Sequence, residues 1–241
     1  MSQNILLMKF LNKFNFFLFF SFLCLLFLSI LFFIDQFFLI KKIELISDKK
    51  FSIANKSELI NKNLVFINQD KIAKKIILEN SLLKTVIVDK VWPSTLKITV
   101  YFYKPMAALI VNQGFFNLST DGRILSKIKE NQSSLPIINY YQKLNKNSFQ
   151  TGDWINYKDI QQALFFIDKL GQINLRPLTI DISGQDMLVF NLKGEKEIIF
   201  SNKKEKELQD YQLEFIIRQF KIEGKEFKKI DLRFDRPIIS F

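Results

Sequence analysis

The longest uninterrupted apolar segment of the chain lies near its N-terminus, between Phe14 and Ile34. These 21 residues carry no charged side chain, and an α-helix of that length spans roughly 31 Å, about the hydrocarbon thickness of a bilayer. A cleaved signal peptide has a shorter apolar region that ends at small residues, whereas this segment runs into polar residues from Asp35 onward. The pattern predicts an uncleaved membrane-spanning helix over residues 14–34, with residues 1–13 as a short tail.

The block that follows has the expected order strand, helix, helix, strand, strand. Alternating apolar and polar residues predict the strands, and Asn68 can cap the second helix, which turns Ile72 and Ile76 inward. The Trp92-Pro93 pair starts the last turn, where proline fixes φ and tryptophan can cap the small core. The elements expected are a strand over residues 41–47, helices over 55–63 and 68–79, and strands over 85–91 and 96–104.

A second block is richer in short strands. Asp121-Gly122 lies between two of them and signals a tight turn. Asn156 can cap a helix that ends near Gly171 and carries one apolar stripe. The elements expected are strands over residues 107–111, 115–118, 124–127, 136–139, 178–182, 187–192 and 196–200, helices over 156–171 and 203–221, a strand in which Ile230, Leu232 and Phe234 share one face, and an extended piece over 237–241.

The charge of the chain does not by itself indicate nucleic-acid binding. The net charge is +11, but only five of the 35 basic residues are arginine, the preferred reader of phosphate and guanine. We therefore expect no nucleic-acid partner. The chain lacks histidine and has a single cysteine, Cys24, inside the apolar segment, which excludes His-dependent nucleophile systems and an intrachain disulfide.

No motif in the sequence predicts a catalytic, cofactor-binding, metal or small-molecule site. The S-x-x-K pattern of serine transpeptidases occurs five times without its S-D-N and K-T-G companions, the frequency that a Lys-rich chain produces by chance. Glycine-rich phosphate loops are absent from the sequence. Carboxylate pairs such as Asp181 with Asp186, or Asp231 with Asp235, leave a membrane-anchored envelope enzyme as the rival hypothesis.

One segment and several later motifs follow a known family pattern in order. In VDKVWPSTLKITVYFYKPMAAL (residues 88–109), Trp92, Pro93, Leu96 and Pro105 occupy pattern positions. Later matches are Asp121-Gly122 in a D-x-x-G-like turn, Leu135-Pro136, and Ile230-Asp231-Leu232-Arg233-Phe234. Together they resemble the FtsQ/DivIB family of bacterial cell-division proteins. The chain departs from that family where Phe102-Tyr103-Lys104 replaces a usual acidic residue.

The resemblance implies an α+β fold: an N-terminal transmembrane helix, a small POTRA (polypeptide-transport-associated) domain over residues 41–106, and a mostly antiparallel β domain with two flanking helices over 107–241. It implies a non-enzymatic, single-pass inner-membrane scaffold of the divisome at the division septum. Its N-terminus is then cytoplasmic and its domains are periplasmic, although lysines on both sides of the apolar segment leave the orientation open on charge alone. A POTRA-bearing translocation chaperone is disfavoured, because too little chain remains for a barrel.

The family's expected partners are FtsB and FtsL, small bitopic proteins through which it regulates septal peptidoglycan synthesis. The alternating segment from Ile230 to Phe241 has no later strand to cover it, and an open strand edge can accept a further strand. We expect Phe234 to be the apolar anchor of this strip and Arg236 to pair with an acidic segment. The alternative, that Phe234 packs inside the β domain, stays open. The expected partner-binding residues are Phe234, Arg236, Pro237, Ile238, Ser240 and Phe241.

Overall fold

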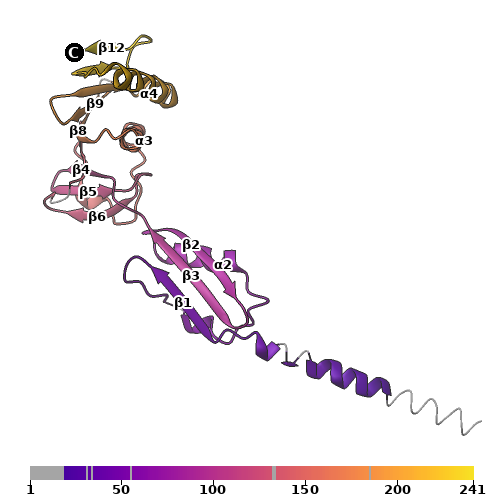
Figure 1. Ribbon diagram of the computed structural model, residues 1–241. Coiled ribbons are helices and arrows are strands. Elements are labelled where there is room, and N and C mark those ends of the chain that lie inside the picture. The colour runs from indigo at the N-terminus through magenta and orange to yellow at the C-terminus, as the bar shows by residue number, and fades with distance from the viewer. Residues whose placement is uncertain (1–18, 31, 34, 55, 132–133, 185) are drawn as a thin grey trace, which may run out of the picture. The chain divides into compact units, whose positions relative to one another are not determined.

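The computed structural model describes residues 19–30, 32–33, 35–54, 56–131, 134–184 and 186–241 of an α+β protein. The chain divides into two compact units, one ending at Phe102 and the other beginning at Tyr103 (Figure 1). Each unit has its own hydrophobic core. The tail expected over residues 1–13 lies outside the described residues, as do positions 14–18 of the expected membrane helix.

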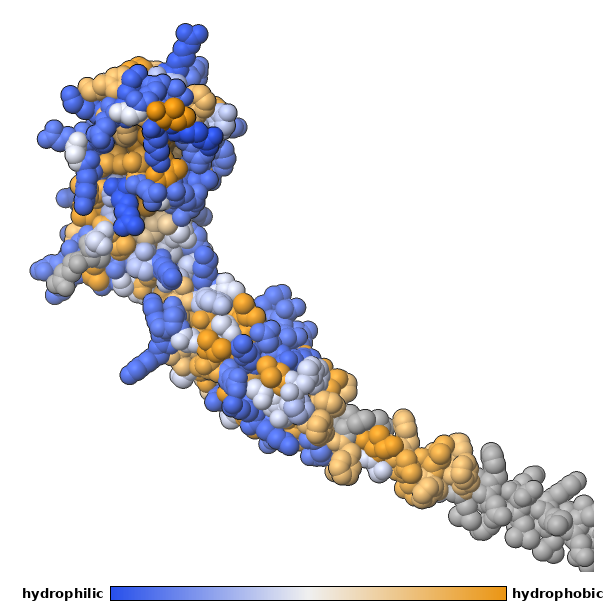
Figure 2. Space-filling view, viewed as in Figure 1, coloured by the Kyte–Doolittle hydropathy of each residue, from blue (hydrophilic) through white to orange (hydrophobic). Residues whose placement is uncertain are grey.

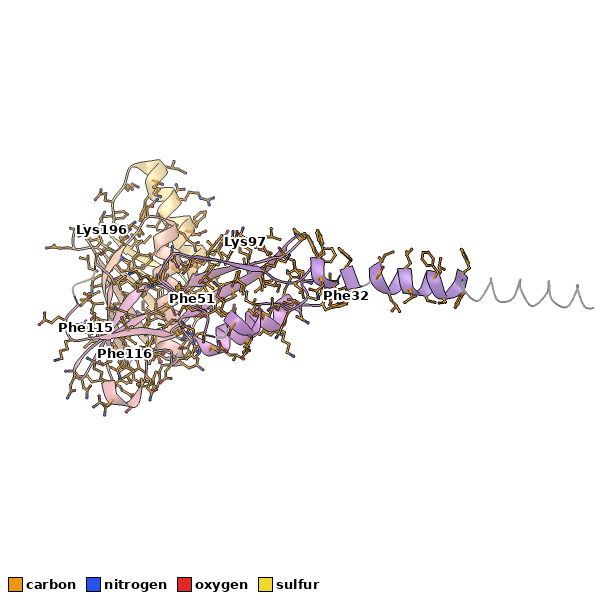
Figure 3. The ribbon with its side chains drawn as sticks, turned by 90° about the horizontal axis from the view of Figure 1, so that it is seen from below. Phe32, Phe51, Lys97, Phe115, Phe116 and Lys196 are labelled. Atoms are coloured by element: carbon orange, nitrogen blue, oxygen red, sulfur yellow. The ribbon has the colours of Figure 1, made fainter. Side chains whose placement is uncertain are left out.

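An apolar helix over Phe19–Phe37 precedes the first strand, and we refer to it as the apolar helix. Among the described residues it is the one helix long and apolar enough to cross a membrane. Its described apolar side chains, Phe32 among them, are exposed (Figures 2 and 3). The helix continues beyond the predicted end at Ile34 to Phe37, and Asn63 Nδ2 of the smaller unit donates to Asp35 Oδ1 at 2.6 Å.

The smaller unit is built on a sheet with the strand order β1-β3-β2. Its elements are β1 (Lys42–Ser47), the 3-10 turn η1 (Lys56–Glu58), α2 (Gln69–Glu79), β2 (Leu83–Val91) and β3 (Thr95–Phe102). β3 pairs with β1 in parallel and with β2 antiparallel. Asn68 caps α2 as predicted, since its side chain accepts a hydrogen bond from the backbone N–H of Lys71 at 2.9 Å.

The core of the smaller unit lies under α2, where Ile76 is buried among side chains of all three strands. The helix predicted over residues 55–63 is wrong in extent: Asn55 lies outside the described residues, and only η1 is helical in the rest. Asn61 has φ of 62°, a left-handed conformation that cannot continue a right-handed helix.

The larger unit is built on a sheet with the strand order β12-β11-β10-β9-β8-β7-β4-β5-β6. Its strands are β4 (Ala107–Val111), β5 (Gly114–Leu118), β6 (Ile124–Ile128), β7 (Ile137–Tyr140), β8 (Pro177–Ser183), β9 (Met187–Leu192), β10 (Glu197–Ser201), β11 (Lys229–Asp231) and β12 (Ile238–Ser240). The sheet is mixed, because β4–β7, β7–β8 and β10–β11 are parallel while the other neighbours are antiparallel.

The helices of the larger unit explain two of these parallel pairs. α3 (Lys158–Gln172) connects β7 to β8, and α4 (Lys206–Glu223) connects β10 to β11. A helical crossover returns the chain to the end at which the previous strand began, so the next strand runs parallel to it. Both helices share the core of the sheet, where Phe166 of α3 stacks on Phe200 of β10 with ring centroids 3.8 Å apart.

Two expectations for the larger unit are wrong in detail. Asn156 does not cap α3: the N-cap is Tyr157, which makes no side-chain capping bond. Of the alternating strand expected from Ile230 to Phe234, only β11 forms: Ile230 and Leu232 are buried as alternation predicts, but residues 233–236 form a bend and Phe234 is 48% exposed. Asp231, between the two apolar residues, is also buried and pairs with Arg233, so the inward–outward alternation does not hold there. η2 (Lys146–Ser148), a 3-10 turn, completes the described elements.

Candidate partner-binding edge

The sheet of the larger unit has β12 at one end of its strand order and β6 at the other. β12 pairs antiparallel with β11, with Ile239 opposite Ile230. Within the part of the chain that the structure describes, no strand pairs with the other side of β12. Its outward N–H and C=O groups therefore form a template for a strand from another chain.

Helix α4 carries a second apolar row besides the row in the core. Leu213, Ile217 and Phe220 are buried against the sheet, as their spacing predicts. On the outer side, large apolar side chains recur at intervals of three, four and seven residues, which keeps them near one another on the helix surface. These exposed residues are Leu208, Tyr211, Phe215 and Ile222. A clustered apolar row of this kind marks an interaction surface more often than isolated exposed residues do.

An apolar groove of about 280 Å³ lies between α4 and the last strand. It is lined by Tyr211, Gln212, Phe215, Ile216, Pro237 and Ile239. Ile239 packs partly against the core, whereas its neighbours Ile238 and Ser240 are exposed, so the side chains of β12 alternate about the sheet. A strand added to β12 would place every second side chain on the groove side.

The bend between β11 and β12 is fixed by hydrogen bonds from neighbouring elements. Lys204 Nζ donates to the carbonyl of Phe234 at 2.7 Å and to that of Leu232 at 3.2 Å. Gln212 Nε2 donates to the carbonyl of Asp235 at 3.3 Å. The backbone of the bend is thus held in place while the Phe234 side chain stays 48% exposed. Because the backbone of the bend is already ordered, less conformational entropy is lost when a partner binds there.

At the start of the same bend, the buried Asp231 carboxylate pairs with the partly exposed Arg233 guanidinium. Arg233 Nε donates to Asp231 Oδ1 at 2.9 Å, and Arg233 Nη2 donates to Asp231 Oδ2 at 2.7 Å. Burial alone would raise the pKa of the Asp231 carboxyl, but the side-chain and backbone hydrogen bonds from Arg233 outweigh it, so the pKa lies below its ordinary value. The two-point contact fixes Arg233, whose guanidinium lies 5.5 Å from the ring of Phe234.

The predicted partner-binding residues lie in two adjoining places. Phe234 and Arg236 belong to the bend, and Phe234 is not a core residue, which answers the alternative left open by its spacing. The remaining four lie in or beside β12, with Pro237 in the groove, Ile238 and Ser240 exposed, and Phe241 5.6 Å from the ring of Phe220. Their role in binding stays a prediction. Tyr211 and Phe215 were not predicted as part of the binding surface, although they lie three and seven residues after Leu208, which is helical spacing.

The residues of the family-like pattern have different environments. Leu96 is fully buried in the smaller unit, but Trp92, expected to cap that core, is 55% exposed beside an exposed Pro93. Its ring contacts Phe38, at the end of the apolar helix, with centroids 5.2 Å apart. The core needs no cap there, because β2 and β3 already close it with aliphatic side chains. Pro105 is exposed near the start of the larger unit.

The Asp121-Gly122 turn joins β5 to β6 as predicted and is tightly packed. Gly122 has φ of +84°, and a Cβ there would lie 2.9 Å from the Ile155 carbonyl. Both facts require glycine at this position. The Ser119 hydroxyl hydrogen-bonds the Asp121 carboxylate and accepts a bond from the Arg123 N–H at 2.9 Å. The turn is therefore structural rather than a binding element.

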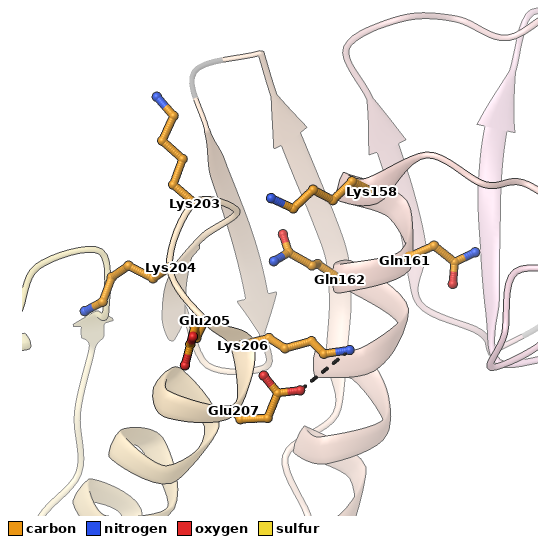
Figure 4. A pocket seen from close by; sticks show the side chains of 8 residues that line it. All are labelled: Lys158, Gln161, Gln162, Lys203, Lys204, Glu205, Lys206 and Glu207. Carbon is orange, nitrogen blue, oxygen red and sulfur yellow. Dashed lines mark ion pairs between the residues drawn. The ribbon is translucent and has the colours of Figure 1, made fainter.

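A second, polar pocket of about 360 Å³ lies between the start of α3 and the loop before α4 (Figure 4). Three of its four lysines are already engaged: Lys203 pairs with Asp186, Lys204 Nζ donates to the Phe234 carbonyl, and Lys206 Nζ lies 3.8 Å from Glu207 Oε1. Lysines that are paired in this way leave a weaker field for a charged ligand. We therefore place the candidate site at the apolar groove.

The carboxylates considered for acid–base chemistry are engaged in structural contacts. Asp181 accepts hydrogen bonds from Asn139 and Asn191, Asp186 pairs with Lys203, and Asp231 pairs with Arg233. Asp235 is fully exposed, with its Oδ1 4.0 Å from Lys204 Nζ. Among the described residues, no group of three or more His, Cys, Asp and Glu side chains is arranged to hold a metal ion.

Comparison with known proteins adds no assignment. No protein-family model matches the sequence, and no curated protein matches it significantly. The sheet edge, the groove and the apolar helix are therefore the features on which a functional proposal rests.

Proposed function

We propose that this protein is a membrane-anchored, non-enzymatic scaffold of the bacterial cell-division machinery, of the FtsQ/DivIB kind. The apolar helix anchors it in the inner membrane, with the N-terminus in the cytoplasm and the two units in the periplasm at the septum. The smaller unit serves as a POTRA domain and the larger one as the β domain of that family. The scaffold binds the FtsB–FtsL complex and so regulates septal peptidoglycan synthesis.

The observation that carries the proposal is the open edge of β12 beside the apolar groove of α4. A partner strand gains backbone hydrogen bonds from the edge and places side chains in the groove, so one surface supplies both affinity and specificity. Phe234 supplies an aromatic anchor, and the exposed Arg236 can pair with an acidic residue of the partner. Aromatic and arginine side chains are the types most often found to dominate binding energy at interfaces.

The proposal predicts that Phe234→Ala combined with Arg236→Glu weakens capture of the FtsB–FtsL complex from the same organism. Losing two dominant contacts should raise Kd by about 100-fold or more. Biolayer interferometry with the full-length chain in detergent micelles measures this affinity. Thermal unfolding should change little, because neither side chain belongs to the core.

The matched control is Leu178→Ala combined with Arg176→Glu. Leu178 is also 48% exposed, and Arg176 is an exposed arginine, but Leu178 lies at the start of β8 and Arg176 directly before it, inside the strand order and not at its edge. This control should bind like the unchanged chain. Equal binding by all three proteins would reject the β12 edge as the interface, and a joint loss of folding and binding in the first variant would assign its residues to the fold.

A further inference from the structure

Two loops of the smaller unit contact the chain where it leaves the apolar helix. The first, residues 61–66, is joined to it by hydrogen bonds from Leu64 N to the Phe38 carbonyl at 2.8 Å and from Ile40 N to the Lys62 carbonyl at 2.9 Å. The second is the β2–β3 turn, where Lys41 N donates to the Ser94 carbonyl at 2.9 Å. The end of the helix and both loops therefore form one local structure.

Large apolar side chains cover this structure and stay outside the core. We call them the collar: Phe37, Val65, Phe66, Val91 and Trp92, all exposed. Phe66 is 83% exposed, although it lies only two residues from the fully buried Leu64. Lys90 Nζ donates to the Val65 carbonyl at 2.8 Å, which ties the two loops together. The hydrophobic colouring of the helix continues onto this end of the unit in Figure 2.

The collar lies at the level where the bilayer surface would meet the protein. The charge-free apolar segment ends at Asp35, so the hydrocarbon layer ends near that residue and Phe37 falls at its boundary. The ring centroid of Phe37 lies 5.2 Å from that of Phe38, which in turn lies 5.2 Å from that of Trp92. The headgroup region on each side is roughly 5–8 Å thick, which places the tryptophan within or next to it.

The side chains of the collar and its neighbours are of types that favour the membrane–water interface. Tryptophan is enriched at membrane–water interfaces, because its ring has an apolar body and a polar N–H. The exposed Lys41 and Lys62 lie beside the same loops, where basic side chains attract anionic headgroups. Because the collar continues the lipid-facing surface of the helix, the occupant that the structure favours is the bilayer itself.

We propose that the collar inserts into the headgroup region of the membrane and seats the smaller unit on the bilayer surface. This inference rests on the proposed membrane anchoring, but it is independent of partner binding at β12. It gives Trp92 a lipid contact in place of the core position expected from the sequence.

The test uses full-length chains with a single tryptophan, reconstituted into vesicles of phosphatidylcholine and phosphatidylglycerol. Trp154→Phe leaves Trp92 alone, and Phe66→Trp with Trp92→Phe and Trp154→Phe reports on the other loop. The matched control is Tyr101→Trp in the same double-Phe background, an exposed position on β3 about 20 Å further along that strand than Thr95. Emission is compared with and without phosphatidylcholine brominated near the headgroup.

The proposal predicts that bromolipid quenches tryptophan at positions 92 and 66 strongly, with blue-shifted emission, and leaves position 101 unquenched. Emission from 92 and 66 that is unaffected by bromolipid, or equal quenching at all three positions, overturns the collar. Vesicle flotation separates this failure from a failure of the anchor. A chain that floats without quenching retains the anchor and loses the collar, whereas a chain that does not float contradicts both.

Discussion

Trp92 and Leu96 lie four positions apart at the β2–β3 turn, yet their surroundings are opposite. Leu96 is fully buried among the side chains of the smaller core, and Trp92 is 55% exposed with one ring contact, to Phe38. Sequence identifies both as apolar residues at a strand turn, but it does not state which of them the core has room for. Aliphatic side chains fill that core, so the larger ring stays outside.

Truncation of Leu96 and of Trp92 should therefore have very different effects on stability. Leu96→Ala should destabilise the smaller unit by about 2–5 kcal/mol, because it leaves a cavity in a packed core. Trp92→Ala should cost about 1 kcal/mol or less, the value of one aromatic contact at an exposed site. The opening free energy of β3, obtained from amide hydrogen exchange of the full chain in micelles, measures both. A similar loss of opening free energy in the two variants would show that Trp92 contributes to the core as Leu96 does.

At the scale of elements, the β11–β12 connection depends on the Asp231–Arg233 pair. The pKa of the Asp231 carboxyl is lower in the folded protein than its ordinary value, so the folded state favours the charged form. Such a group stabilises the fold above its unfolded pKa, and that contribution is lost as the pH falls through the folded pKa. The connection should therefore weaken in acid and not in base.

This predicts that the thermal midpoint falls as the pH drops below about 4, the ordinary pKa of an aspartate, and on through the lower pKa of the folded state. Asp231→Asn should be less stable at neutral pH and should show a smaller decline over that range. Circular dichroism melts at several pH values measure both effects. Asp235→Asn is the control, because Asp235 is a fully exposed carboxylate four residues away. An acid response of Asp231→Asn identical to that of the unchanged chain would contradict the role of the pair.

Local pattern predicted most elements of the fold. β4 and β9 have the predicted bounds, and Ile160, Ala163 and Leu170 of α3 are buried as their spacing requires. What failed was non-local. Periodicity indicates that a segment is a strand but not which strand it pairs with, so the parallel crossovers through α3 and α4 were not foreseen.

The candidate site was predictable in part for the same reason. The open sheet edge was predicted from the alternating segment between Ile230 and Phe241. Phe234 is exposed, as a role in binding requires. The groove needed α4 and β12 to lie together, which only the folded sheet order provides. α4 has two apolar rows in sequence, and which row faces the core depends on the neighbours that pack against it.

For the whole molecule, the proposed anchor and the proposed docking edge belong to different compact units. The apolar helix and the collar belong to the first unit, and β12 with the groove of α4 belongs to the second. Each unit therefore has a separate task in this account, one toward the membrane and one toward a partner. The central claim is that β12 accepts a strand from the FtsB–FtsL complex.

The most direct test of that claim is hydrogen–deuterium exchange of the full-length chain in micelles, with and without the FtsB–FtsL complex. Strand addition converts exposed backbone N–H groups into hydrogen-bonded ones, so exchange of β12 and of the adjoining bend should slow when the complex is added. β6, the opposite edge of the same sheet, is the internal control and should exchange at an unchanged rate. Unchanged exchange of β12 at saturating partner, or protection of β6 instead, would contradict the account.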